Sequence, residues 1–126
     1  MNLKPAIPVL RIFDVDLAKA FYVDWLGFTL DWAHEFGPTF PKYLQVSRDA
    51  LILHLSEHYG DGSPGAKLLI NLDDVDSLHA ELATRPNPRM RPGVEVAPWN
   101  ARVMEVIDPF GNRLVFNQNL DLHPLK

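Results

Sequence analysis

The sequence predicts an α+β fold built from a duplicated strand–helix–strands unit. The same order of patterns, an apolar strand, an amphipathic helix and then further strands, occurs in each half of the chain. The tripeptide Asp-Val-Asp also occurs twice, at residues 14–16 and 74–76, each time after a strand and before a helix. We therefore expect one domain, residues 1–126, made of two modules at about residues 7–58 and 66–118.

The first module begins with an apolar strand that carries a proline. Pro8 cannot donate to a sheet ladder, so it is expected at the start of this strand or on a sheet edge. Asp14 can cap a helix that should end near Gly27, a residue suited to the position after a helix. The remaining elements expected here are strands at 28–32, 42–47 and 51–56, with a loop at 34–41.

The second module repeats this order. A strand at 68–72 precedes a helix capped by the Asp73–Asp74 pair, and strands follow at 94–97, 101–108 and 113–117. Asp108-Pro109-Phe110-Gly111 has the residues of a type I turn, which predicts a hairpin between the last two strands. Each half has about 60 residues, near the lower limit for a stable core. The halves must therefore bury their faces against each other or against a second chain, and two curled sheets would enclose a cleft suited to a ligand.

Composition narrows the function. The chain has no cysteine, which removes disulfides, thiol catalysis and Cys-ligated zinc. The net charge is −4 and no basic tract is present, so nucleic acid is not an expected partner. No apolar run reaches membrane-spanning length and no signal-peptide pattern is present. We expect a cytoplasmic protein that does not bind membranes.

No catalytic motif stands out. The sequence lacks a Gly-x-Ser-x-Gly elbow, a P-loop and a dinucleotide fingerprint. His54, Ser56 and His58 alternate along one strand, but this spacing separates them by about 7 and 14 Å, too far to converge on one ion. A polar group facing a cleft is the better interpretation of His54.

Several segments together resemble the vicinal oxygen chelate superfamily, which includes glyoxalase I, extradiol dioxygenases, fosfomycin-resistance enzymes and bleomycin-resistance proteins. The segments are Ile7–Asp14, Phe21-Tyr22, Leu26-Gly27-Phe28 and Asp108-Pro109-Phe110-Gly111-Asn112. The resemblance implies two βαβββ modules that form a cleft. Pro98-Trp99 ahead of the last turn, with Pro8 in the first strand, is most similar to the bleomycin-resistance branch. That branch implies a homodimer with an exchanged N-terminal arm.

The resemblance also indicates where metal-dependent members carry their ligands. The matching positions are Ile7, His54, roughly Lys67, and Val115, and of these only His54 is a normal ligand for a divalent ion. We therefore expect no metal and no cofactor, and we favour binding over catalysis. The alternatives are a metal-dependent glyoxalase or dioxygenase with differently aligned ligands and a regulatory or accessory ligand sensor.

The resemblance implies non-covalent binding and sequestration of a bleomycin-like antibiotic, which has a flat aromatic part and a cationic tail. Aromatic faces and carboxylates suit such a ligand. Asp31 and Trp32 match the acidic–aromatic pair that bleomycin-resistance proteins carry after their first helix. The expected ligand-binding residues are Asp31, Trp32, Phe36, Tyr43, His54, Trp99 and Asn100.

Overall fold

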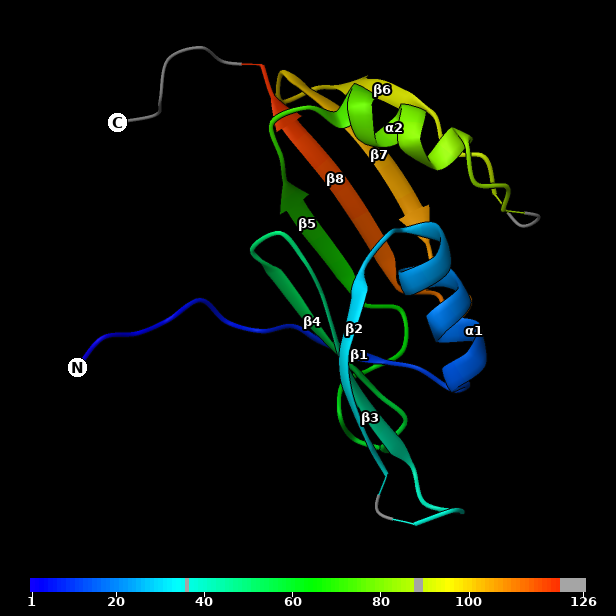
Figure 1. Cartoon of the computed structure of the whole chain (residues 1–126). Coiled ribbons are helices and arrows are strands. Elements are labelled where there is room, and N and C mark those ends of the chain that lie inside the picture. Colours follow the sequence, from blue (N-terminus) through cyan, green and yellow to red (C-terminus); the bar gives the residue numbers. More distant parts are fainter. Residues whose placement is uncertain (36, 88–89, 121–126) are drawn as a thin grey trace. The chain divides into compact units, whose positions relative to one another are not determined.

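Both halves of the chain repeat one order of elements in the computed structural model, which describes residues 1–35, 37–87 and 90–120 (Figure 1). The first half contains β1 (Val9–Arg11), α1 (Val15–Lys19), the π-helix η1 (Ala20–Trp25), β2 (Thr29–Glu35), β3 (Lys42–Arg48) and β4 (Leu51–Ser56). The second contains β5 (Lys67–Asn71), α2 (Val75–Ala83), β6 (Val94–Ala97), β7 (Ala101–Ile107) and β8 (Arg113–Asn119). The predicted βαβββ repeat is confirmed.

The chain forms two compact units, each with its own sheet. Unit 1 comprises Met1–Ala66 with Asp108–Asn112, and unit 2 comprises Lys67–Ile107 with Arg113–Lys126. The strand order is β1-β4-β3-β2 in unit 1 and β5-β8-β7-β6 in unit 2. In each sheet the first strand runs parallel to the last, and the other pairs are antiparallel. Mixed sheets with two short helical segments confirm the predicted α+β class.

The repeated aspartates begin both helices. The carboxylate of Asp14 accepts from the backbone N–H of Leu17, and that of Asp74 accepts from Ser77 in the same way. These bonds satisfy N–H groups that have no partner within the helix. Gly27 follows the first helix with φ of 77°, as predicted. That helix is not the single α-helix we expected, because its second half, η1, winds as a π-helix.

The Asp108–Asn112 hairpin turn is tied into unit 1 by a buried polar network. Asp108 accepts from the Tyr22 hydroxyl at 2.6 Å, from the backbone N–H groups of Phe110 and Asn112, and from Asn112 Nδ2. Asn112 Nδ2 also donates to the carbonyl of Arg11, while its Oδ1 accepts from the N–H of Ala66. The predicted hairpin turn is present, and its two polar side chains, Asp108 and Asn112, form their hydrogen bonds within the protein.

Strand alternation places the cores. In unit 2, Met104, Val106, Leu114 and Phe116 are buried, and α2 packs over β6, β7 and β8.

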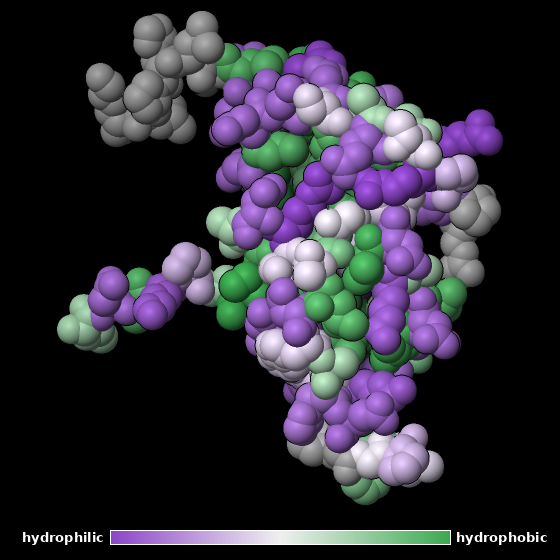
Figure 2. All heavy atoms as spheres, viewed as in Figure 1, coloured by the Kyte–Doolittle hydropathy of each residue, from purple (hydrophilic) through white to green (hydrophobic). Residues whose placement is uncertain are grey.

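In unit 1, β1 is an edge strand and Pro8 directly precedes it, in agreement with the expected position of the proline. The arm at residues 1–7 is exposed and carries both hydrophilic and hydrophobic side chains (Figure 2). No helix in the described part of the chain is long and apolar enough to cross a bilayer.

Candidate ligand-binding face of unit 1

The unit 1 sheet has one apolar face and one polar, aromatic face. Leu44 and Val46 of β3 and Leu53 and Leu55 of β4 are buried on the first face. The residues between them point to the opposite side, because successive strand side chains alternate. The register pairs Gln45 with His54 and Tyr43 with Ser56, so these side chains share the second face. We call this second face the polar face.

A β-bulge brings two neighbouring residues of β2 to the polar face. The register between β2 and β3 shifts between Leu30 and Trp32, which leaves Asp31 as the extra residue. Asp31 accepts hydrogen bonds from the Gln45 and Ser47 side chains, and Trp32 stacks beside Tyr43. Regular alternation would have placed one of these two side chains on the apolar face. The bulge therefore re-aims a carboxylate and an indole to the same side.

Three rings gather on the polar face. The Trp32 and Tyr43 rings are stacked, with centroids 6.0 Å apart and 12° between their planes. The His54 ring meets both edge-on, at 5.4 Å from Trp32 and 5.1 Å from Tyr43. Trp32 is 42% exposed, so much of its indole surface faces solvent. This is an ordered aromatic surface open to a ligand.

A chain of hydrogen bonds fixes these rings. Gln45 Nε2 donates to the Asp31 carboxylate at 3.1 Å, so Gln45 Oε1 is the acceptor for His54 Nε2 at 2.9 Å. A neutral His54 then carries its proton on Nε2, and its Nδ1 accepts from the Tyr43 hydroxyl at 2.7 Å. Desolvation lowers the pKa of His54, which favours this neutral form. The network thus holds an uncharged imidazole between the phenol and the amide.

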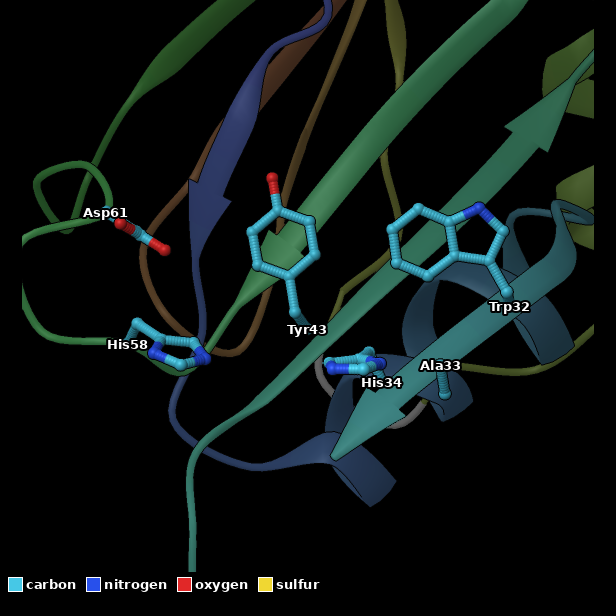
Figure 3. Close-up of a pocket in the computed structure, with 6 residues that line it drawn as sticks. All are labelled: Trp32, Ala33, His34, Tyr43, His58 and Asp61. Carbon is cyan, nitrogen blue, oxygen red and sulfur yellow. The ribbon is translucent and has the colours of Figure 1, made fainter. Parts of the chain in front are cut away.

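A cavity of about 550 Å³ opens at the β2–β3 end of this face. It is lined by Trp32, Ala33, His34, Tyr43, His58 and Asp61 (Figure 3). The Trp32 and Tyr43 rings lie beside each other, with His58 and Asp61 on the far side of Tyr43 (Figure 3). Desolvation, followed by the charge of Asp61, raises the pKa of Tyr43, so its hydroxyl stays protonated at neutral pH. The cavity combines aromatic walls with a carboxylate.

The structure brings four of the predicted ligand-binding residues together: Asp31, Trp32, Tyr43 and His54. It places Trp99 and Asn100 in unit 2, at the turn between β6 and β7, where Asn100 adopts φ of 59°. Phe36 lies outside the described residues. The expected loop from His34 is wrong at its start, because β2 continues through Glu35 and puts His34 in the cavity wall.

Sequence reasoning missed several contributors. Gln45 and Ser47 lie two and four residues after Tyr43, so strand alternation could have placed them on its face. Asp61 belongs to a glycine-rich connection, and no local pattern ties it to Tyr43. Its position depends on the fold, through a hydrogen bond from the Ser56 hydroxyl. Among residues 1–35, 37–87 and 90–120, no group of three or more His, Asp or Glu side chains is arranged to hold a metal ion.

Two βαβββ modules with an open polar face on a mixed sheet are the architecture that the resemblance to the vicinal oxygen chelate superfamily implies. Comparison with known families agrees with this class of protein. A family model described as glyoxalase superfamily protein matches residues 1–123, so the chain belongs to the glyoxalase superfamily. No curated protein matches the sequence.

Solved structures confirm the resemblance to the bleomycin-resistance branch. A glyoxalase/bleomycin resistance protein from Streptomyces sp. CB03234 is 30% identical over 90% of this chain and 100% of its own, with a TM-score of 0.64. A bleomycin-binding protein from bleomycin-producing Streptomyces verticillus, complexed with copper(II)-bleomycin, is 29% identical over 94% and 98%, with a TM-score of 0.70. A bleomycin-binding protein complexed with bleomycin has a TM-score of 0.71 at 23% identity over 93% and 99%, a likeness of fold alone.

Proposed function

We propose that this protein binds a flat, cationic antibiotic of the bleomycin type and sequesters it without chemical change. The observation that carries the proposal is the stacked Trp32–Tyr43 pair on the open polar face, held in place by His54. A planar heteroaromatic group can stack on this surface, and each such contact contributes roughly 0.5–1.5 kcal/mol beyond the burial of area. Mass action then lowers the free drug concentration.

The charges around the polar face suit a cation. Both Asp31 oxygens accept from neutral side chains, Gln45 and Ser47, so these bonds leave its negative charge uncancelled. Asp61 adds a second carboxylate at the cavity wall. The net charge of −4 favours approach of a positively charged ligand. The aromatic rings and carboxylates thus match the two chemical parts of the proposed ligand.

A solved relative supports the same ligand class. The bleomycin-binding protein from bleomycin-producing Streptomyces verticillus, which is 29% identical to this chain, was determined with copper(II)-bleomycin bound. A shared fold does not fix the ligand, so the titration described below tests it directly. We further propose that Phe36, Trp99 and Asn100 contribute to ligand binding and that the protein is cytoplasmic.

We also propose a homodimer in which the arm ending at Pro8 is exchanged between subunits. The exposure of residues 1–7, including Met1 and Leu3, supports a second chain as their partner. Light scattering of the full chain should give twice the monomer mass. Removal of residues 1–7 should shift the equilibrium toward monomer, and an unchanged dimer after this truncation would contradict arm exchange.

Calorimetric titration with bleomycin tests the proposed function. We expect saturable binding and a Kd that rises about tenfold, a loss of about 1.4 kcal/mol, in Trp32→Ala. Phe40→Ala is the matched control, because Phe40 is 55% exposed but does not line the cavity. Mass spectrometry of the recovered drug should show no modification. Absence of binding at micromolar drug would remove bleomycin as the ligand.

Metal analysis of the same preparation tests the alternative of a metal-dependent enzyme. Protein purified without chelator should contain no stoichiometric Zn, Ni, Mn or Fe under the sequestration proposal. A metal ion at one equivalent per chain, lost together with an activity on addition of chelator, would favour a lyase or dioxygenase. A chemically altered drug would likewise contradict sequestration.

A further inference from the structure

Unit 2 carries a cluster of three asparagine side chains around the Trp99 indole, and the proposed function, which includes Trp99, does not explain the three asparagines. Asn71 ends β5, and Asn117 is its register partner on the parallel strand β8. Asn117 is 2% exposed, whereas Asn71 and Asn119 are exposed. The Trp99 indole reaches this cluster from the turn between β6 and β7. We call these four residues the carboxamide cluster.

The indole sets the orientation of all three carboxamides. Trp99 Nε1–H can only donate, and it lies 2.8 Å from Asn117 Oδ1, which must therefore accept. Asn117 Nδ2 then donates to Asn71 Oδ1 and Asn119 Oδ1, each at 3.0 Å. Because both oxygens turn inward, the two terminal NH₂ groups of Asn71 and Asn119 turn away from the buried amide.

These two NH₂ groups have no acceptor among residues 1–35, 37–87 and 90–120. They border a cavity of about 310 Å³, lined by Asn71, Leu72, Asp73, Asn117, Gln118 and Asn119. This volume is at the lower end of the range for small-molecule pockets, roughly 300–1,000 Å³. The cavity lies at the carboxyl ends of two adjacent parallel strands, a place where open sheets commonly bind ligands.

Unit 1 supplies an internal comparison at the same topological place. Arg11 and Ser56 pair at the carboxyl ends of β1 and β4, and Arg11 precedes its helix-capping aspartate by three residues, as Asn71 does. There both polar side chains form hydrogen bonds within unit 1: Arg11 donates to the Glu57 carbonyl, and Ser56 donates to Asp61. In unit 2 the corresponding donors face the cavity. The same end of the unit 1 sheet is formed without such donors. Forming the carboxyl end of the sheet therefore does not explain the carboxamide cluster.

We propose that the carboxamide cluster is a binding site for a neutral, hydroxyl-rich group such as a sugar ring. The Asn71 and Asn119 NH₂ groups can donate to hydroxyl oxygens, and the Asp73 carboxylate can accept from hydroxyl hydrogens. Trp99 is 55% exposed while its N–H is anchored, which fixes an aromatic face beside the cluster. Only a group that both accepts and donates uses all of these partners.

The lining argues against an anion. Asp73 places a carboxylate in the cavity wall, and the neighbouring N-terminus of α2 is already capped. The Asp74 carboxylate accepts from Ser77 N–H, and Gln118 Oε1 accepts from Val75 N–H. The helix end therefore offers its first N–H groups to protein oxygens, and an acidic ligand would meet like charge.

NMR titration of the full-length protein with methyl β-D-glucopyranoside tests the site. We expect saturable shifts of the Trp99 indole N–H and of the Asn71 and Asn119 NH₂ signals, with the Trp32 indole N–H unmoved. Asn119→Ala and Asn71→Ala should each weaken binding about 3- to 10-fold, the loss of one hydrogen bond. Asn2→Ala, in the exposed arm, is the matched control and should change nothing.

Two reference titrations define the contrary outcomes. Sodium acetate, which offers only acceptor oxygens and a negative charge, should leave the same signals in place. Saturation by acetate but not by the glycoside would overturn the proposal, as would shifts spread evenly over both units or no shift with either probe. Bleomycin binding is followed at Trp32 in unit 1 and glycoside binding at the Asn71 and Asn119 NH₂ groups in unit 2, so either site can fail without the other.

Discussion

Unit 1 contains two polar networks that differ in burial and in what they leave free. The buried network, Tyr22 with Asp108 and Asn112, is closed to solvent, and each of its polar side chains bonds within the protein. The network of the polar face consists of Asp31, Tyr43, Gln45, Ser47 and His54 and is only partly buried. The first ties the Asp108–Asn112 turn into unit 1, and the second exposes the aromatic rings and the carboxylate that we propose as the ligand-binding surface. The Asp108–Asn112 segment, which most clearly carries the resemblance to the family, therefore has a structural role.

Loss of the buried acceptor should have the largest effect. Asp108→Ala leaves the Tyr22 hydroxyl and three N–H donors without their acceptor. We expect the free energy of unfolding to fall by about 3 kcal/mol, because each buried unsatisfied donor costs about 1–3 kcal/mol and neighbouring losses are not additive. Urea denaturation measures this. Asp24→Ala, at an exposed helix position, should stay within about 0.5 kcal/mol.

On the polar face, a substitution should weaken ligand binding strongly and change the free energy of unfolding only slightly. Trp32→Ala should weaken ligand binding about tenfold, while the free energy of unfolding changes by about 1 kcal/mol or less, because Trp32 is 42% exposed. Denaturation and calorimetry on the same preparation give both values. If this variant unfolded as readily as Asp108→Ala, the division between the two networks would be wrong.

The dependence of stability on alkaline pH tests the buried network, because Tyr22 titrates in this range. Desolvation, and then the charge of Asp108, raises the pKa of Tyr22 well above its ordinary value of 10.0. The unfolded chain therefore loses this proton first, and folding stability should fall as pH rises above about 10. Tyr22→Phe should flatten that fall in Tm between about pH 9 and 11, relative to Tyr59→Phe at a 97% exposed position. Equal slopes would contradict the inferred burial of this phenol.

The smallest effect is expected at mildly acidic pH. The pKa of His54 is lowered by desolvation from its ordinary value of 6.5, so its contribution to stability is present above pH 6.5 and is lost as pH falls through the folded pKa. His54→Gln should reduce the drop in Tm between pH 7 and 5. NMR titration of the His54 ring should give a midpoint below about 6.5. A midpoint above this value would mean that the imidazole is stabilised in its charged form.

Much of the fold could be predicted because its signals are local. The aspartates at 14 and 74 cap helices through bonds to residues three positions away, and Asp108-Pro109-Phe110-Gly111 forms its turn within four residues. The π-helical turn of η1 was missed, since no residue in Ala20–Trp25 marks it in the sequence.

The candidate site was predictable only in part. Residue type and resemblance predict Asp31, Trp32, Tyr43 and His54 as site residues. The bulge that turns Asp31 and Trp32 to the same side depends on strand pairing across β2 and β3. Gln45 was overlooked because its role depends on two partners on other strands, Asp31 and His54. The carboxamide cluster likewise requires the register of β5 with β8. Alternation along β3 places Gln45 on the face of Tyr43, but its hydrogen-bond partners and the carboxamide cluster depend on long-range strand pairing, which local sequence does not encode.

The three tryptophans allow one spectrum to test the central claim. Trp25 is buried in η1, Trp32 lies on the polar face and Trp99 belongs to the carboxamide cluster. In a ¹H–¹⁵N spectrum recorded during a bleomycin titration, we predict that the Trp32 indole N–H shifts saturably while that of Trp25 stays in place. A saturable titration that moves other signals and leaves Trp32 unmoved would contradict the assignment of the polar face as the ligand-binding surface.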